Sequence, residues 1–334
     1  MTQESLDGKT ILVTGGTGSF GQRFCRTILD RYKPKKLIVF SRDELKQFEM
    51  ANHPDFCDHD LIVRYFIGDV RDPNRLKMAF RDVDYVIHAA ALKQVPAAEY
   101  NPFECIRTNV YGAENVVTAA IESNVKRVVA LSTDKAASPI NLYGASKLAS
   151  DKIFTAALNL VGAGDPLFCA VRYGNVLGSR GSVVPFFKKL IGEGATELPI
   201  TDPRMTRFWI TLQQGVDFVL SSLVLMQGGE IFVPKIPSMS VSDLAEFMAP
   251  GMPQKTVGIR PGEKLHEDII TEGDARTVLE LPDRYVIRHD GRLATSYHPD
   301  EKPVSDDFRY ASNVNADRLD AARIGALLSE LEAK

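Results

Sequence analysis

A tyrosine and a lysine four residues apart, Tyr143 and Lys147, could move a proton together. On a helix the two side chains share one face. A tyrosine takes a hydroxyl proton only when its phenolate is stabilised, because its ordinary pKa is about 10, and a nearby ammonium group provides that stabilisation. Thr133 follows an apolar run over 126–131 and could orient the same hydroxyl group. The spacing occurs by chance on many surface helices, so it predicts base catalysis only together with other signals.

A glycine-rich loop supplies the second signal. The pattern Gly-x-x-Gly-x-x-Gly over 15–21 follows a predicted strand over 11–14 and precedes a predicted helix over 20–32. Its first glycine permits a tight turn, its second lets the backbone approach a pyrophosphate, and its third lets helix and strand pack closely. The helix N-terminus then faces the anion. The cofactor contacts predicted from this loop are Gly15, Thr17, Gly18, Ser19, Phe20 and Gly21.

The end of the next predicted strand, over 36–40, bears on which dinucleotide binds. NAD-binding proteins usually place an acidic residue there for the ribose 2′-hydroxyl, whereas an arginine suits the 2′-phosphate of NADP. Here Ser41 and Arg42 could both contact a 2′-phosphate, with Lys46 one turn later. Asp43 argues for NAD, but it could instead cap the next helix. The residues favour NADP.

Short β-branched runs alternate with helical stretches through the first half of the chain. This alternation predicts an α/β fold, a Rossmann-type doubly wound parallel sheet. We expect a dinucleotide-binding domain over 1–177 that also receives later strands such as Glu230–Pro234. From 178 prolines interrupt the rhythm, which predicts a smaller, less regular substrate lobe over 178–334, interleaved with the first domain. The strand ends at Asp69–Val70 and Ala89–Ala90 add expected cofactor contacts, although Asp69 could equally be a plain turn residue. Tyr143 and Lys147 complete the expected cofactor contacts, since Lys147 can also hold the nicotinamide ribose.

Composition excludes several classes of protein. Forty basic and 43 acidic residues give a net charge of −3 without a basic block, which argues against a nucleic-acid partner. No apolar run reaches the ~18–20 residues that a membrane span requires, and the N-terminus does not resemble a signal peptide. The four cysteines lie far apart, which predicts neither a zinc site nor disulfides and suggests a cytoplasmic protein. The histidines lack metal-ligand spacing, and His88 ends an apolar run, so we expect a core histidine and no metal.

Longer motifs carry a family resemblance over residues 8–290. The chain resembles the extended short-chain dehydrogenase/reductases that act on nucleotide sugars, in the segments TGGTGSFG, HAAALKQVP, TNVYGAENV and YGASK. It is most similar to the inverting UDP-N-acetylglucosamine 4,6-dehydratases of pseudaminic acid biosynthesis, in STDKAASPINLYGASK, RYGNVLGSRGSVVPFF, DPRMTRFWIT and RPGEKLHE. The resemblance implies UDP-N-acetylglucosamine as substrate, NADP as cofactor, and a homo-oligomer, either a dimer or a larger assembly up to a hexamer.

The same resemblance gives roles to Asp134 and Lys135. Retaining sugar dehydratases of this superfamily place an Asp-Glu pair after the threonine, whereas this chain has Asp-Lys. By resemblance Asp134 is the acid for the departing C6 hydroxyl and Lys135 the base that removes the C5 proton. The ordinary pKa of a lysine is about 10.4, so we expect burial or the cations Lys147 and Lys93 to lower the pKa of Lys135. Taken alone, Lys135 could be a surface lysine paired with Asp134.

The substrate contacts expected from the resemblance lie on several loops. Lys93 follows a strand where family members line the nicotinamide and the sugar, and Asn175 matches a diphosphate-contacting asparagine. The planar guanidinium groups of Arg207 and Arg260 suit the phosphate oxygens of UDP. For each of these arginines the alternative is an ordinary surface salt bridge. The full set of expected substrate contacts is Lys93, Asn175, Ser182, Val183, Thr201, Arg207, Arg260 and Glu263.

Two other functions compete with the dehydratase. A UDP-N-acetylglucosamine 4-epimerase would share the fold, the loop, Tyr143 and Lys147, but it needs no acid and base aimed at C5 and C6. The pair Asp134–Lys135 therefore favours the dehydratase. A non-enzymatic NADP-sensing module would typically lose the tyrosine or the lysine, and both are present.

Overall fold

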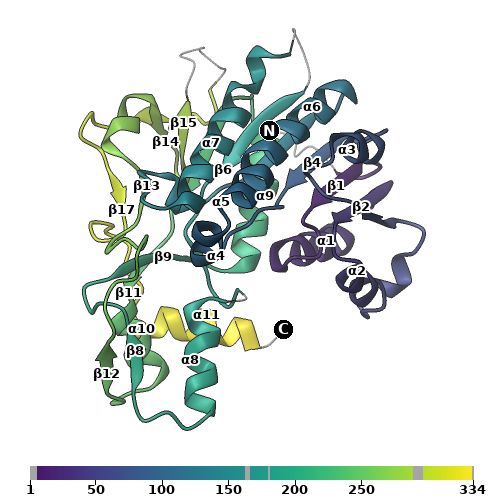
Figure 1. Cartoon of the computed structure of the whole chain (residues 1–334). Helices are drawn as coiled ribbons and strands as arrows, with labels where there is room; N and C mark the ends of the chain where they lie inside the picture. The colour runs from purple at the N-terminus through teal and green to yellow at the C-terminus, as the bar shows by residue number, and fades with distance from the viewer. Residues whose placement is uncertain (1–5, 162–165, 180, 289–295, 333–334) are drawn as a thin grey trace.

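A ten-stranded sheet forms the centre of the computed structural model, which describes residues 6–161, 166–179, 181–288 and 296–332 (Figure 1). The strand order is β16-β14-β15-β10-β6-β5-β4-β1-β2-β3. The parallel strands are β1 (Thr10–Thr14), β2 (Lys36–Ser41), β3 (Val63–Ile67), β4 (Tyr85–His88), β5 (Arg127–Leu131), β6 (Leu167–Val171) and β10 (Glu230–Pro234). The antiparallel edge consists of β14 (Val278–Glu280), β15 (Arg284–Arg288) and β16 (Lys302–Pro303). The predicted doubly wound parallel sheet is confirmed.

The strand order reverses at β1. This strand pairs with β2 on one side and β4 on the other, with Thr14 opposite Phe40 and His88. In such sheets, ligands bind beyond the carboxyl ends of the strands at the reversal. The glycine loop follows β1 and Ala89 follows β4, so both lie at this place in the fold.

Successive residues of a strand point to opposite faces of the sheet, and apolar side chains of β1 lie on both faces. Helices cover both faces. On one face Ile11 and Val13 pack in a core with α1 (Ser19–Arg31) and α9 (Leu212–Leu225). On the other face Leu12 packs with a second core. The helices of that second face are α3 (Pro73–Ala79), α6 (Gly112–Glu122) and α7 (Leu142–Ala156). The remaining helical elements of the first half are α2 (Glu44–Ala51), α4 (Val95–Tyr100), α5 (Pro102–Ile106), η1 (Cys57–His59), the π-helical η2 (Arg107–Tyr111), η3 (Asp134–Ala136) and η4 (Ala157–Asn159).

A smaller set of elements lies at one end of the sheet (Figure 1). In one of its sheets β9 (Thr206–Ile210) pairs with both β11 (Ser238–Ser240) and β7 (Asn175–Val176). In two others β12 (Gln254–Thr256) pairs with β8 (Leu198–Ile200), and β13 (Asp268–Ile270) with β17 (Tyr310–Ala311). Its helices are α8 (Val183–Gly192), α10 (Val241–Met248), α11 (Ala321–Glu332) and η5 (Glu272–Thr277). The predicted returning strand Glu230–Pro234 is confirmed as β10, while the domain boundary at 177 stays a prediction.

Two smaller expectations can be compared with the structure. His88 is buried and its Nδ1 lies 2.8 Å from the hydroxyl of Thr14, with its ring packed on Phe154. Burial lowers the pKa of His88 to about 3, so it is a neutral core histidine, as expected. Within the described ranges, no helix combines the length and apolar character needed to cross a membrane.

Candidate active site

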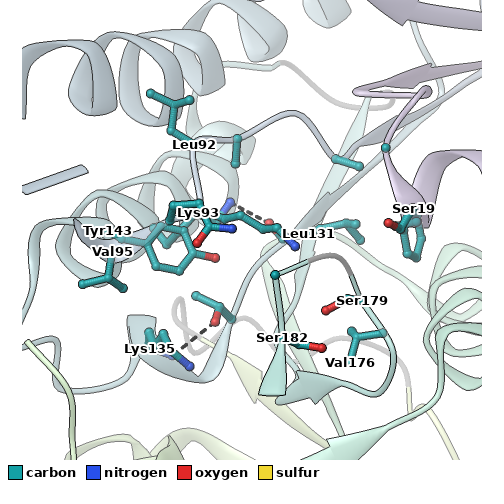
Figure 2. A pocket seen from close by; sticks show the side chains of 18 of the residues that line it. Ser19, Leu92, Lys93, Val95, Leu131, Lys135, Tyr143, Val176, Ser179 and Ser182 are labelled. Carbon is teal, nitrogen blue, oxygen red and sulfur yellow. Dashed lines mark hydrogen bonds between the residues drawn. The ribbon is translucent and has the colours of Figure 1, made fainter. Parts of the chain in front are cut away.

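A cavity of about 830 Å³ opens at the carboxyl ends of the parallel strands and continues between the two sets of elements. Every residue predicted to bind the cofactor or substrate lines it. So do the predicted catalytic residues, with the exception of Asp134. Figure 2 shows Tyr143, Lys93 and Lys135 on one side of this cavity, with Ser19 and Ser182 across from them. The fold therefore gathers side chains from distant parts of the sequence at one place.

The glycine loop has the shape that a dinucleotide needs. Gly15 adopts a φ of +67°, and a Cβ atom there would lie 2.9 Å from the backbone of Ala90. A Cβ atom on Gly21 would lie 2.5 Å from the Cα atom of Gly16. Helix α1 begins after Gly18 without a side-chain cap, so its first backbone N–H groups point towards the loop. These features fit a bound pyrophosphate.

At the adenosine end of the cavity, Asp43 caps α2. Its carboxylate accepts a hydrogen bond from the backbone N–H of Lys46 at 3.0 Å and pairs with the Lys46 ammonium group. The Thr17 and Ser41 hydroxyls lie 2.8 Å apart. Arg42 is largely exposed, and its guanidinium lies 3.7 Å from Asp69. The helix-capping alternative for Asp43 is thus confirmed, and Arg42 remains accessible at the cavity wall.

Helix α7 presents Tyr143 and Lys147 to the cavity. Asn141 caps this helix by accepting a hydrogen bond from the N–H of Gly144 at 2.7 Å. Lys147 is buried, and its ammonium group donates to the carbonyl of Leu131 at 2.6 Å. Burial lowers the pKa of Lys147, although the carboxylate of Asp151 opposes this. The helix and the end of β5 therefore hold the pair in the geometry that the spacing predicted.

The phenol of Tyr143 is influenced by a second lysine. Burial raises its pKa to about 12, while the ammonium group of Lys135 and a hydrogen bond with Thr133 act in the opposite direction. Lys135 is the cation with the strongest effect on Tyr143. From the four-residue spacing in α7, the sequence indicated that Lys147 would be the cation that stabilises the Tyr143 phenolate.

Lys135 lies between two carboxylates. Its Nζ atom is 3.0 Å from Oδ1 of Asp134, 3.4 Å from Oε1 of Glu267 and 3.5 Å from Oδ1 of Asn175. Burial alone would lower the pKa of Lys135, but Asp134 and Glu267 raise it above its usual value. The expectation that Lys147 and Lys93 lower this pKa is therefore wrong.

Asp134 lies behind the cavity wall. Its side chain is almost fully buried, and Oδ1 accepts hydrogen bonds from Thr133 Oγ1 at 2.9 Å and from Lys135 at 3.0 Å. Its Oδ2 atom has no hydrogen-bond partner among the residues that the structure describes. Any proton that Asp134 gives to a ligand in the cavity must pass through Thr133 or Lys135.

The expected substrate contacts differ in how available they are. Ser182 stands at the N-terminus of α8, and its buried hydroxyl has no hydrogen-bond partner within the described part of the chain. Arg207 is buried and donates to the carbonyls of Thr206, Leu265 and Lys264. These bonds occupy the fork that was expected to hold phosphate oxygens.

The other arginine expected on the substrate side is Arg260. It is exposed at the rim of the cavity and pairs with Glu263. The surface salt bridge named as its alternative is therefore present, and its contact with phosphate stays a prediction.

Comparison with known proteins identifies the family. The family model described as polysaccharide biosynthesis protein matches residues 11–289. The chain belongs to this family. A Campylobacter jejuni relative (serotype O:23/36) named UDP-N-acetylglucosamine 4,6-dehydratase (inverting) is 55% identical over 318 residues, 93% of this chain and 94% of the relative. A UDP-glucose 4-epimerase from Rickettsia akari is 40% identical over 341 residues, 97% of this chain and 96% of the relative.

Two solved structures share the fold of this chain. Pen from Bacillus thuringiensis superposes with a TM-score of 0.89 at 35% identity, covering 98% of this chain and 99% of Pen. DesIV from Streptomyces venezuelae, a dTDP-glucose 4,6-dehydratase, superposes with a TM-score of 0.65 at 24% identity, covering 77% of this chain and 86% of DesIV. The second likeness shows the fold alone. The resemblance to extended short-chain dehydrogenase/reductases is confirmed by the family model and the curated relatives.

A buried carboxylate of the cavity wall was missed in the sequence. Glu267 is almost fully buried, lines the cavity and contacts Lys135, yet it was not among the expected site residues. It is the last residue of the segment RPGEKLHE, so its place in that segment was a signal. A carboxylate in a charged surface-like stretch gave no indication by itself that it would be buried.

A close backbone contact in this polysaccharide biosynthesis protein fixes η3 against α7. A Cβ atom on Gly144 would lie 2.2 Å from the carbonyl oxygen of Lys135. We expect Gly144→Ala to push Lys135 away from Tyr143, lowering turnover by about 100-fold and the free energy of unfolding by about 1–3 kcal/mol. Product formation and thermal unfolding measure the two effects. The exposed neighbour Ala145 provides the control, since Ala145→Ser should change neither.

Proposed function

We propose that this chain is an inverting UDP-N-acetylglucosamine 4,6-dehydratase, a hydro-lyase. Its products are UDP-2-acetamido-2,6-dideoxy-β-L-arabino-hex-4-ulose and water. The observation that carries the proposal is Lys135, which enters the same cavity as Tyr143 with Asp134 directly behind it. The two Campylobacter jejuni relatives of that name, 55% and 61% identical, support it.

The residues present divide the reaction into proton steps. Tyr143 takes the C4 hydroxyl proton, oriented by Thr133. A nicotinamide dinucleotide held by the glycine loop and Lys147 would accept hydride from C4 and would supply hydride to C6. Between these events Lys135 removes the C5 proton, whose bonding electrons form a C5–C6 double bond as the C6–O bond breaks. Asp134 provides the proton with which the C6 oxygen leaves as water, through Thr133 or Lys135. When C6 gains hydride, C5 takes a proton on the face opposite to the one that lost its proton, which inverts C5.

We propose NADP as the dinucleotide. Arg42 is accessible beside Ser41 and Lys46, while Asp43 is engaged in capping α2. The remaining predicted contacts, from Asp69–Val70 to Ala89–Ala90, continue along the same cavity. The DesIV structure, by contrast, contains NAD, so the choice of dinucleotide needs its own test.

Arg42→Ala is expected to weaken NADP binding by about tenfold and to leave NAD binding nearly unchanged. The reason is the loss of a cation for the 2′-phosphate, which NAD lacks. Titration of protein freed of its dinucleotide with each one, followed by protein fluorescence, measures this. The half-buried Arg64 on β3 does not line the cavity and gives the control, Arg64→Ala. Equal weakening of both dinucleotides would contradict a 2′-phosphate contact.

We propose that UDP lies at the N-terminus of α8. Three groups face this part of the cavity and suit a diphosphate: the Ser182 hydroxyl, which has no partner among the described residues, the backbone at Val183 and the amide of Asn175. Thr201, Arg260 and Glu263 line the side expected to hold the nucleoside.

The assembly and the pathway also stay proposals. Exposed aromatic side chains of α4, α5 and η2, Tyr100, Phe103 and Tyr111, support a homo-oligomer. The pathway to pseudaminic acid rests on the resemblance alone.

A proton NMR time course tests the function. The purified holoenzyme is mixed with UDP-N-acetylglucosamine in deuterated buffer without added cofactor, because the overall reaction is redox-neutral. A 6-methyl signal with deuterium at C5 and L-arabino couplings is the expected result. The same methyl signal with D-xylo couplings would indicate a retaining dehydratase and remove the proposed role of Lys135.

The second candidate is a 4-epimerase. It is favoured by the Rickettsia akari relative, a UDP-glucose 4-epimerase that covers nearly the whole chain. Formation of UDP-N-acetylgalactosamine without a methyl signal would establish it. If the protein bound the dinucleotide but turned over no UDP-sugar, the non-enzymatic NADP-sensing module would be the remaining function.

A further inference from the structure

Glu267 is a buried carboxylate at the wall of the active-site cavity. It lies just before β13, and its Oε1 atom is 3.4 Å from Lys135 Nζ and 3.8 Å from Arg207 Nε. Its Oε2 atom is 3.9 Å from Lys264 Nζ and has no hydrogen-bond partner among the described residues. Burying a carboxylate is costly unless it is paired, so Glu267 must be held there by these cations.

We propose that Glu267 is a positioning residue for Lys135: its carboxylate holds the ammonium group against Asp134 and controls when that group can give up its proton. This inference rests on the proposed function, in which Lys135 must become a neutral amine before it can take the C5 proton. It adds a residue from the second half of the chain to the acid–base pair of the first half.

The backbone of Glu267 is fixed by residues that the sequence left without a role. Its N–H donates to Oγ of Ser312 at 2.9 Å, and its carbonyl accepts from the N–H of Ser312 at 2.8 Å. Ser312 is fully buried and also donates to the carbonyl of Thr206 at 3.1 Å. The segment around β17 thus fixes the backbone from which the carboxylate of Glu267 extends. A glutamate on a freely moving surface segment would have no such anchor.

Lys135 needs such an anchor. A lysine side chain is long and flexible, and only a fixed partner on each side defines where its ammonium group lies. Asp134 supplies one partner from the adjacent position and Glu267 supplies the other from across the cavity wall. The two carboxylates together raise the pKa of Lys135 despite its burial. The neutral amine is consequently scarce until the pH rises or a charge is removed.

Several other charged or titratable groups lie near Lys135 and Glu267 and influence the pKa values of both. They are Asp134 of η3, Tyr143 of α7, Arg207 of β9, and Lys264 of the segment before β13. Arg207 lowers the pKa of Lys135, opposite to Asp134 and Glu267. Neutralising Glu267 leaves Lys135 with one carboxylate and the same cations, so the amine loses its proton at lower pH.

The test is the pH dependence of C5 exchange in the holoenzyme. The initial rate of deuterium incorporation at C5 is measured between about pH 6 and pH 10 for the wild type and Glu267→Gln. Because Asp134 and Glu267 raise the pKa of Lys135 above its usual value, the wild-type exchange rate should rise across this whole range. We expect the Glu267→Gln variant to reach any given exchange rate at a pH lower by about 1 unit or more. If Glu267 only stabilised the fold, Glu267→Gln would lower the exchange rate at every pH instead of raising it.

Two further variants complete the experiment. Glu267→Asp keeps the charge at a greater distance and should move the rise in the same direction by less, which decides the matter if Glu267→Gln does not fold. Asp268→Asn is the matched control, because Asp268 pairs with Arg309 outside the cavity and should leave the rise in place.

The outcomes separate the two proposals. A rise that stays in place in both Glu267 variants, or moves equally in Asp268→Asn, overturns the role of Glu267. A wild-type protein that shows no exchange at C5 overturns the proposed function itself.

Discussion

Tyr143→Phe is expected to lower the rate of C4 oxidation by about 10²–10⁴-fold. The variant keeps the ring but removes the phenolate that takes the C4 hydroxyl proton. Neither methyl product nor C5 exchange should then appear, because both follow the 4-ketone. Since burial raises the pKa of Tyr143 to about 12, the wild-type rate should also increase with pH from neutrality upwards. A stopped-flow record of bound-cofactor reduction measures both effects.

The control for this variant removes a phenol elsewhere. Tyr32 packs against the hydrophobic core next to α1 and does not line the cavity. The Tyr32→Phe variant should therefore oxidise C4 at the wild-type rate. Dinucleotide affinity should be similar in all three proteins. Oxidation in Tyr143→Phe within tenfold of the wild type would mean that another group takes the hydroxyl proton.

The parallel part of the fold could be predicted because each element carries its own local signal. The run TILVT became β1, and the glycine loop that follows it has the tight turn at Gly15 that its sequence indicates. The antiparallel edge could not be predicted in the same way. Strands such as β14 and β16 have three and two residues, too few for a pattern of alternation to stand out.

The cavity was predictable from strand ends, whereas its electrostatics were not. Tyr143 and Lys147 share a helix face, and their four-residue spacing predicts this without any knowledge of the fold. The pKa of Lys135 depends instead on Glu267, which is distant in the sequence and is brought close by β13 packing beside η3. Reasoning from neighbouring cations therefore gave the wrong direction for that shift.

The burial of Asp134 changes how the acid–base pair works. Adjacent residues in a motif suggest two groups that both face the ligand, but η3 turns Asp134 behind the wall and Lys135 into the cavity. Lys135 is then the group in the cavity that both carboxylates, Asp134 and Glu267, contact. The distinction between dehydratase and epimerase consequently rests on this one lysine.

Lys135→Gln is expected to lower C5 deuterium exchange by about 10³-fold or more while C4 oxidation continues, since a neutral amide cannot accept the C5 proton. Lys135→Arg separates base catalysis from charge. Arginine keeps the cation between Asp134 and Glu267 but stays protonated, so it should also lose exchange. Exchange is measured by proton NMR in deuterated buffer, and oxidation by cofactor reduction. Exchange retained in the arginine variant would mean that Lys135 acts through its charge. Exchange retained in both variants would assign the C5 base to another residue.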